Sequence, residues 1–264
     1  MLDVLTVSET WLDSSVPNSE IEIPGYSIFC LNRLDNVGGG VCAFVKHNLK
    51  VELLSELSFT GESGLHQLWL KVQAGNCKSF LICTAYRPPL TSTDCFDEEF
   101  SDAFISAMSL NKPIYILGDL NCNLLKPADP ASQDFLNFCT SLNLIQMIVE
   151  PTRVTESSAT LFDVILASNN NLVRTAKGMP VSISDHDVVY AVLKLKRQRP
   201  KPTFITARSF KKYQHEVSLR DISLIPWSVV DCFDEVNDSL HAFNLLFNEV
   251  LDEHAPVSTI KLRD

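Results

Sequence analysis

The chain lacks the features that would place it across a membrane. No apolar run approaches the roughly 20 residues that a membrane-spanning helix needs. Its first residues, Met-Leu-Asp-Val-Leu, lack the basic start of a signal peptide. With 264 residues, 45% of them hydrophobic and 20% charged, the chain has the composition of a globular protein, long enough for one large domain and an appendage. We therefore expect an intracellular protein with no membrane partner.

The chain also lacks a cysteine motif. None of its eight cysteines forms a Cys-x-x-Cys pair, which argues against a zinc site or a redox motif. Several of them, Cys42 and Cys83 among others, lie inside apolar, strand-like segments. We therefore expect buried free thiols rather than disulfides.

Positive charge is scarce overall, because the net charge is −10 at pH 7. This excludes a generally basic nucleic-acid coat. The charge is unevenly distributed, however: from Ala191 to Lys212 the chain has eight basic residues and no acidic one. The acidic remainder suits a divalent cation, and the basic segment either follows a phosphate backbone or is a solvated linker.

No internal repeat or low-complexity tract is present, and short apolar segments separated by turn signals predict many strands and few helices. This order predicts an α+β fold of two packed mixed sheets flanked by helices. A change of composition at Lys194 predicts a domain boundary, with domains at 1–195 and 196–264. We expect a hairpin connection at 35–40, strands at 2–9, 26–31, 41–45, 65–72, 79–86, 114–118, 161–167 and 188–195, and helices at 97–109, 133–141 and 236–251.

The stretch Ile114-Tyr-Ile-Leu-Gly-Asp-Leu-Asn121 is the centre of the expected site. Its first four residues predict a buried strand that Gly118 ends. Residues two apart in an extended chain point to the same side, so Asp119 and Asn121 are expected to emerge together.

Four further polar positions accompany apolar strands: Glu9, Tyr86, Asp163 and the pair Asp185-His186. Each alone has an ordinary explanation, as a surface carboxylate, a core aromatic residue or a solvated turn. Asp163 lies in an otherwise apolar strand, and a buried carboxylate needs a partner such as His186. Together with Asp119 and Asn121, these groups suit the hydrolysis of a phosphate ester with a metal-binding carboxylate.

The motifs resemble those of the endonuclease/exonuclease/phosphatase superfamily, specifically the endonuclease domain of LINE-type (non-LTR) retrotransposons. They occur in the family's order and span roughly residues 1–195. Any one is weak, whereas the whole set is specific. They are Ser8-Glu-Thr-Trp-Leu12, Gly38-Gly-Gly-Val41, Tyr86-Arg-Pro-Pro89, Gly118-Asp-Leu-Asn121, Pro151-Thr-Arg153, Thr160-Leu-Phe-Asp163 and Ser184-Asp-His186.

The resemblance implies a four-layered α/β-sandwich that nicks DNA with Mg²⁺ or Mn²⁺, and a nuclear location if it acts on chromosomal DNA. Its implied catalytic residues are Asp119, which orients or activates water, Tyr86 and Asn121, which contact or position the phosphate, and His186, which binds the phosphate and is held by Asp163. Implied metal residues are Glu9 and Asp185, of which Asp185 supports either the metal or His186. Thr152 and Thr160 are implied contacts to DNA phosphate.

Residues after 200 resemble the connector between such an endonuclease and a reverse transcriptase, through Pro226-Trp227 and Asp252-Glu-His-Ala-Pro256. No polymerase motif follows, so the chain resembles part of a longer polyprotein. It also resembles an N-terminally truncated member, because the family has an Asn-bearing strand before the one that ends at Glu9.

Two alternatives stay open: an impaired retroelement remnant that only binds DNA or a protein, and an abasic-site nuclease or phosphatase of the same fold. The sequence leaves undecided the DNA target, the general base, the oligomeric state and whether the gene is domesticated.

Overall fold

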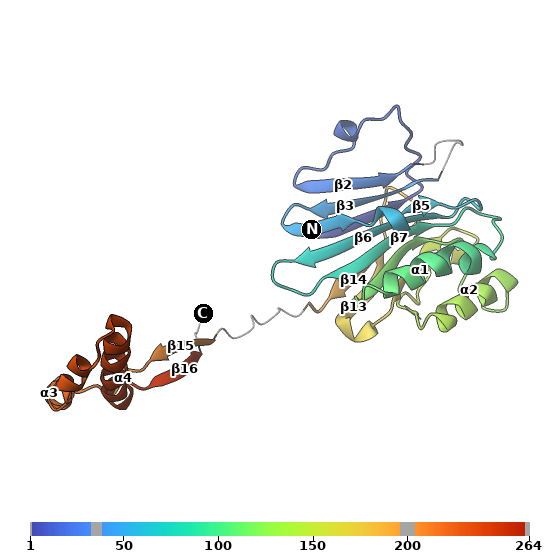
Figure 1. Ribbon diagram of the computed structural model, residues 1–264. Helices are drawn as coiled ribbons and strands as arrows, with labels where there is room; N and C mark the ends of the chain where they lie inside the picture. The colour runs from blue at the N-terminus through green and yellow to red at the C-terminus, as the bar shows by residue number, and fades with distance from the viewer. Residues whose placement is uncertain (1, 33–38, 196–203, 262–264) are drawn as a thin grey trace. The chain divides into compact units, whose positions relative to one another are not determined.

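The computed structural model describes residues 2–32, 39–195 and 204–261, which fall into two compact units, Met1–Gln198 and Arg199–Asp264 (Figure 1). The expected hairpin connection at 35–40 lies mostly outside the described residues. Within the described part of the chain, no helix combines the length and apolarity that crossing a bilayer requires.

A seven-stranded sheet forms the centre of the first unit. Its strands follow the order β4-β6-β7-β8-β12-β9, and β5 also pairs with β6. β7 and β8 are parallel, whereas the other pairs are antiparallel. The strands are β4 (Leu49–Leu53), β5 (Phe59–Thr60), β6 (His66–Ala74), β7 (Phe80–Tyr86), β8 (Ile114–Asp119), β9 (Ile145–Gln146) and β12 (Asp163–Ala167).

Two helices cover one face of this sheet (Figure 1). α1 (Ser101–Met108) continues a π-helical turn, η3 (Phe96–Phe100), and α2 (Pro130–Ser141) has proline at its start, where no hydrogen-bond donor is needed. Their buried side chains form an aromatic cluster on the sheet. The cluster includes Trp69, Phe96, Phe100, Phe104, Phe135 and Phe138.

A second layer of strands packs on the opposite face. It consists of a three-stranded sheet in the order β1-β3-β2 and an antiparallel pair, β13 and β14. β1 contacts β7 and β8, and β14 contacts β12. The strands are β1 (Val4–Ser8), β2 (Tyr26–Leu31), β3 (Val41–Lys46), β13 (Val173–Met179) and β14 (Val188–Leu193).

β3 is buried on both faces, which explains its continuous apolar sequence. Val41 and Val45 join the core between the two layers. On the other face, Phe44 packs with Leu12 and Ile23 from the segment that connects β1 and β2. The expected class, packed sheets flanked by helices, is therefore confirmed, and this segment forms the outermost cover.

The expectation that every cysteine is a free thiol is wrong for one pair. Cys30 and Cys42 are register partners on β2 and β3 and form a disulfide. Their proximity results from strand pairing between segments that are separated in sequence, which spacing does not reveal. The other six are free, and four of them are buried.

Gly118 does not end its strand, contrary to the sequence-based prediction. β8 continues through it to Asp119, and Gly118 pairs with Ala85 on β7. Its φ is +150°, and a Cβ atom would lie 1.7 Å from the Ala85 carbonyl oxygen. Glycine therefore allows two parallel strands to approach closely at this position.

Shorter elements complete the first unit. β10 (Arg153–Val154) and β11 (Ala159–Thr160) form a small antiparallel pair. The sequence did not predict β13, because its residues mix polar and apolar types without alternation. The 3₁₀ turns are η1 (Asn18–Glu20), η2 (Ser55–Leu57) and η4 (Asn170–Leu172).

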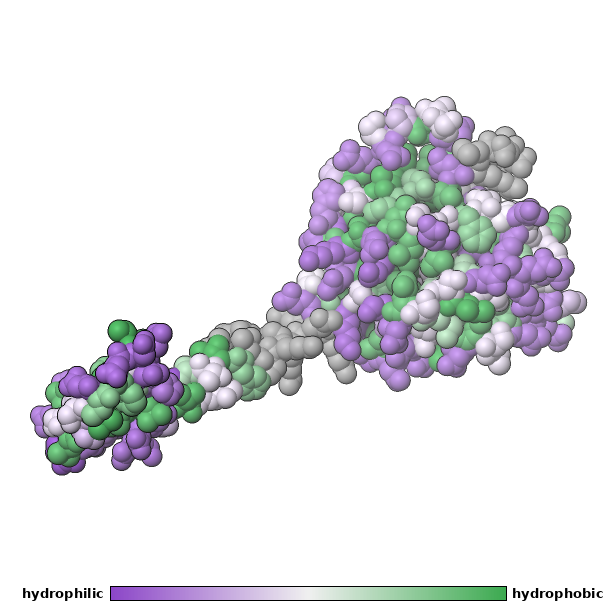
Figure 2. All heavy atoms as spheres, viewed as in Figure 1, coloured by the Kyte–Doolittle hydropathy of each residue, from purple (hydrophilic) through white to green (hydrophobic). Residues whose placement is uncertain are grey.

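The second unit has an antiparallel strand pair, β15 (Phe204–Arg208) and β16 (Val257–Lys261), with α3 (His215–Ser223), η5 (Trp227–Cys232) and α4 (Val236–His254). Trp227 stacks on Phe243 of α4. The expected helix at 236–251 is α4. Hydrophobic and hydrophilic residues are intermixed on the visible face of this unit (Figure 2). Several of its large apolar side chains are exposed, among them Phe204, Leu224, Val236 and Leu240.

Candidate active site

Four polar side chains form a row across the end of the central sheet. His66, Tyr86, Asp119 and Asp163 are consecutive register partners on β6, β7, β8 and β12. Register partners on neighbouring strands point to the same face. Tyr86 and Asp119 are also the last residues of two parallel strands, so the row lies at their carboxyl ends.

The second layer adds one side chain at each side of the row. Glu9 directly follows β1, and its carboxylate accepts a hydrogen bond from the Tyr86 hydroxyl. His186 lies two residues before β14, and its Nδ1 is 2.8 Å from Oδ2 of Asp163. Both pairs join residues that the sequence singled out, and the predicted partner of Asp163 is observed.

Asp119, Asp163 and His186 have ligand atoms within 4.8 Å of one another. Asp119 is only 8% exposed. Burial, followed by the neighbouring Asp163 carboxylate, raises the pKa of Asp119 to about 6, against the opposing effect of the Asn121 N–H. The hydrogen bond that the His186 imidazole donates to the Asp163 carboxylate raises the pKa of His186. The cluster thus combines carboxylates that repel one another with an imidazole that favours its protonated form.

Asn121 does not extend the strand, so the alternation argument for it is wrong. β8 ends at Asp119, and Asn121 has a left-handed backbone with φ of +49°. Its N–H donates to Oδ1 of Asp119 at 2.8 Å, and its side-chain amide donates to the Arg87 carbonyl at 2.9 Å. Asn121 therefore orients the Asp119 carboxylate through its backbone and joins the β8 end to the β7 end through its side chain.

Arg87 is a site residue that sequence reasoning missed. Its guanidinium is buried, donates to the Leu120 carbonyl at 2.8 Å and the Asn121 carbonyl at 3.1 Å, and lies over the Phe96 ring. It also donates to the Thr91 carbonyl. One cation thus fixes the turns that follow Tyr86 and Asp119.

His66 was also missed. It is fully buried; its Nδ1 lies 2.8 Å from the Gly64 carbonyl, and its Nε2 accepts the Gly40 N–H at 3.3 Å. Its ring centroid is 6.0 Å from that of Tyr86. No sequence signal marks His66, which simply begins a strand. Only the pairing of β6 with β7 places it in the row.

The structure places Thr152 inside the protein, not on a surface that could meet DNA directly. The residue is 0% exposed, and its hydroxyl accepts the N–H groups of Phe162 and Asp163 at 3.3 and 3.2 Å. Thr152 therefore positions the start of β12. Thr160 is half-buried, and its hydroxyl lies 3.4 Å from the Arg153 carbonyl.

Asp185 lies outside the cluster of Asp119, Asp163 and His186. Its Oδ2 is 2.6 Å from the Arg153 guanidinium, and hydrogen bonding to Arg153 lowers the pKa of Asp185. Its charge also favours protonation of His186. The structure therefore groups Asp185 with the imidazole side of the site.

The turn after β1 is strained. Glu9 and Trp11 both have a φ of +54°, a left-handed conformation that costs bulky residues about 1–3 kcal/mol each. Backbone hydrogen bonds hold it: Thr10 N–H to the Gly40 carbonyl at 3.3 Å and Trp11 N–H to the Gly39 carbonyl at 2.9 Å. The Glu9 carboxylate is therefore aimed by a fixed, high-energy backbone.

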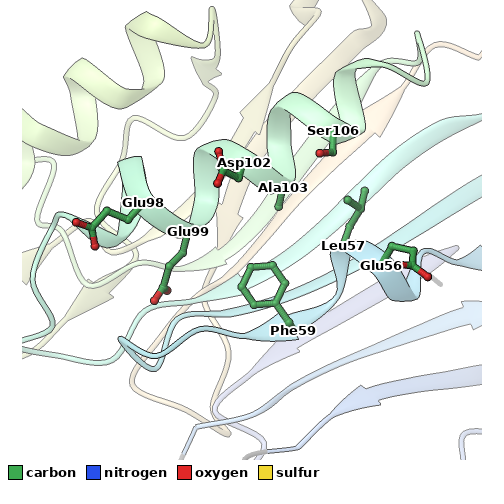
Figure 3. A pocket seen from close by; sticks show the side chains of 8 residues that line it. All are labelled: Glu56, Leu57, Phe59, Glu98, Glu99, Asp102, Ala103 and Ser106. Carbon is green, nitrogen blue, oxygen red and sulfur yellow. The ribbon is translucent and has the colours of Figure 1, made fainter.

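A hollow between the η3–α1 segment and the η2–β5 segment includes no residue of this row (Figure 3). Phe59 and Leu57 line it together with acidic side chains. One of these, Glu99, accepts hydrogen bonds from the Ser63 N–H at 2.9 Å and the Ser63 hydroxyl at 2.6 Å. The hollow's excess of acidic groups disfavours an anionic substrate.

The gathered ligand atoms of Asp119, Asp163 and His186 could hold a divalent cation, and the carboxylate oxygens suit a hard one such as Mg²⁺. Glu9 lies outside this cluster, but its charge reaches Asp119. The partly buried His186 supplies a donor for an anionic oxygen. The arrangement has the groups that phosphate-ester hydrolysis needs: carboxylates for a cation and a water, and a positive imidazole for developing charge.

Comparison with known proteins gives one matching family and several solved structures of similar fold. Residues 80–190 match the family described as Endonuclease-reverse transcriptase. No curated protein matches the chain. The endonuclease domain of TRAS1, a telomere-specific non-LTR retrotransposon, superposes with a TM-score of 0.55 at 14% identity, covering 66% of this chain and 83% of that one.

Two other solved structures have a similar likeness. The AP endonuclease LMAP from Leishmania major gives a TM-score of 0.54 at 14% identity and covers 75% of this chain and 79% of that one. The 3′ phosphatase NExo from Neisseria, bound to a product DNA hairpin, gives 0.53 at 13% identity and covers 73% and 89%. At these identities the likeness is one of fold.

Proposed function

We propose that this chain is a member of the endonuclease/exonuclease/phosphatase superfamily and hydrolyses phosphodiester bonds with the help of a metal ion, nicking DNA internally as a retrotransposon-type endonuclease does. One observation carries the proposal: Asp119, Asp163 and His186 meet within 4.8 Å at the end of the central sheet, with Glu9 and Tyr86 hydrogen-bonded beside them.

Glu9, whose carboxylate is bonded to Tyr86 and acts on the neighbouring Asp119, would hold Mg²⁺ or Mn²⁺. The bound cation supplies charge neutralisation at the phosphoryl oxygens. Asp185 was expected to share this role or to support His186. Its ion pair with Arg153 and its effect on His186 favour the second role.

His186, protonated and held by Asp163, donates a hydrogen bond to a non-bridging phosphate oxygen and stabilises its growing charge. Asp119 orients the attacking water and accepts its proton, because a buried carboxyl with a pKa of about 6 is a stronger base than an ordinary aspartate. The Asn121 N–H fixes the Asp119 carboxylate, and Tyr86 fixes Glu9.

The choice of DNA as substrate is supported by the family matched at residues 80–190 and by the likeness to the TRAS1 endonuclease domain. We propose the second unit, 199–264, as a connector toward a reverse transcriptase, and a nuclear location as the site of action on chromosomal DNA. Thr160, at the rim, is retained as a DNA phosphate contact.

Relaxation of supercoiled plasmid tests the activity. The purified chain should convert plasmid to nicked circles in Mg²⁺ or Mn²⁺ and stop on addition of EDTA. Asp119→Asn and His186→Gln should abolish nicking with unchanged circular dichroism. Plasmid that stays intact with both metals, from a folded protein, would refute the proposal.

Matched controls come from exposed residues outside the row. Asp102→Asn removes an exposed carboxylate on α1, and His47→Gln removes an exposed imidazole between β3 and β4. Both variants should nick at the wild-type rate. Equal losses in Asp102→Asn and Asp119→Asn would mean that general charge, not the row, controls the activity.

A second substrate class is favoured by the likeness to an AP endonuclease and a 3′ phosphatase. Duplexes that carry an abasic site or a 3′-phosphate test it beside the plasmid. Faster turnover of either duplex than of the plasmid would make that reaction, not internal nicking, the function of the site. Metal-independent binding of DNA without turnover would instead favour a remnant that only binds.

A further inference from the structure

Trp11 is an exposed aromatic residue at the edge of the site. Its side chain is 63% exposed, whereas Trp69 is fully buried and Trp227 is half-buried against Phe243. Leaving a tryptophan in water forgoes a large hydrophobic gain, so an exposed, ordered indole is an informative feature.

The backbone holds Trp11 rigidly in spite of this exposure. Its φ of +54° is unfavourable for an aromatic residue, and its N–H donates to the Gly39 carbonyl at 2.9 Å. The next residue, Leu12, packs against the outer face of β2 and β3. The backbone that carries the indole is thus anchored at a fixed point by one hydrogen bond and by the packing of Leu12.

That fixed point is two residues after Glu9, so the two Cα atoms are at most about 7 Å apart. Glu9 itself is exposed and bonded to Tyr86 of the row. A nucleotide whose phosphate binds beside Glu9 would therefore have its base near the backbone of Trp11.

We infer that Trp11 stacks on a nucleobase next to the phosphate that enters the site and so positions the DNA strand. This inference rests on the proposed function. An indole face suits a base because stacking on an aromatic ring requires no particular sequence. The base is also the apolar part of a nucleotide, and it lies only a short distance from the phosphate of that nucleotide. Trp11 is in this role a positioning residue, separate from the groups that act on the phosphate.

Tryptophan fluorescence tests the contact directly. Both proteins measured carry Asp119→Asn, so that the DNA stays uncut. The emission spectrum of Asp119→Asn minus that of the double variant Asp119→Asn/Trp11→Phe gives the emission of Trp11. On addition of a short duplex, this emission should be quenched and protected from iodide. Anisotropy of a labelled duplex records binding independently. Trp11 that stays open to iodide while the duplex is bound overturns the inference and leaves the proposed function standing.

Binding and turnover give the second measurement. Trp11→Asn removes the ring and keeps a residue that tolerates the left-handed backbone. It should weaken duplex binding on the order of tenfold, and raise KM with little change in kcat. Trp11→Phe should stay within about threefold of wild type, since it keeps a stacking face.

The control is Ile105→Ala, which removes an exposed apolar side chain from α1 on the opposite face of the central sheet. It should leave binding and turnover unchanged. Equal binding by wild type and Trp11→Asn, with both proteins folded and nicking plasmid, refutes the stacking role alone. Absence of both DNA binding and nicking in every variant refutes the stacking role together with the proposed function.

Discussion

Asp119 and Asp163 face each other as register partners on antiparallel β8 and β12, which places two carboxylates at one end of the sheet. The burial of Asp119, followed by the repulsion from Asp163, raises the pKa of Asp119 to about 6. Such a pair is unfavourable without a cation, so the site opposes the stability of the fold that carries it.

Asp119→Asn should therefore stabilise the metal-free protein at neutral pH while abolishing nicking. The ordinary pKa of an aspartate is about 4, so the folded state binds this proton more tightly than the unfolded state. The stability that the proton contributes is complete below about pH 4 and is lost as the pH rises through about 6, a loss of about 2–3 kcal/mol. In urea unfolding with EDTA, the free energy of unfolding of the variant should increase relative to that of wild type between about pH 4.5 and 7.5. A constant difference over that range would contradict the shifted pKa.

Mg²⁺ should raise the melting temperature of wild type more at about pH 7.5 than at about pH 5. At the lower pH Asp119 holds its proton, and a protonated carboxyl binds a cation poorly. Ligand that binds only the folded state stabilises it in proportion to the free energy of binding. Calorimetric scans with and without Mg²⁺ measure the effect, and Glu9→Gln should reduce it. An equal rise in melting temperature at both pH values would show that Asp119 is not close to the bound cation.

Asp163→Asn should reduce nicking about 10–100-fold, because the carboxylate orients the imidazole and favours its charge. The rate profile should also change: the decline at high pH, where His186 loses its proton, should move to lower pH. His186→Gln should be inactive, and the double variant no worse than His186→Gln alone. Additive losses would show that the two residues act independently.

Arg87→Lys should destabilise the protein by about 2–4 kcal/mol, since an ammonium group cannot replace a buried fork that donates to three carbonyls. Arg153→Lys, an exposed arginine paired with Asp185, should cost less than about 1 kcal/mol. Chemical denaturation of both variants gives the comparison. Similar losses of stability in the two variants would show that Arg87 does not fix the two turns.

Gly118→Ala should cost at least about 3 kcal/mol, because the new methyl group would meet the Ala85 carbonyl at 1.7 Å. Gly75→Ala is the matched control: φ there is +47°, but no atom lies within 4 Å of the added carbon. It should cost about 1 kcal/mol from backbone strain alone. Equal losses would mean that conformation, not the close approach of β7 and β8, makes glycine necessary.

The sequence predicted those elements whose apolar residues form a clear pattern. The expected bounds of β2 are those observed, and β3, β7 and α4 differ by a few residues. β3 and β7 are continuous apolar segments because packing decides every position. α4 was predicted from helical spacing alone, since none of its residues is buried. β13 was missed because it is only partly covered, so its sequence is free to mix polar and apolar residues.

The site was predictable where a polar residue interrupts an apolar strand, as Asp163 does, and where charge gathers around His186. His66 and Arg87 were missed because their importance comes from register and from turns that meet in space. Thr152 was expected at a DNA surface, whereas its hydroxyl is enclosed by the backbone of Phe162 and Asp163. Residue type alone does not distinguish a hydroxyl that binds a ligand from one that binds the chain.

The row from His66 to Asp163 also has a consequence for synthesis on the ribosome. Its members are far apart in the chain, and His186 is the last residue of the site to be made. Long-range pairings of this kind form late in folding. A nascent chain shorter than about 190 residues has no complete site, so the row and His186 come together only after the whole first unit has left the ribosome and folded.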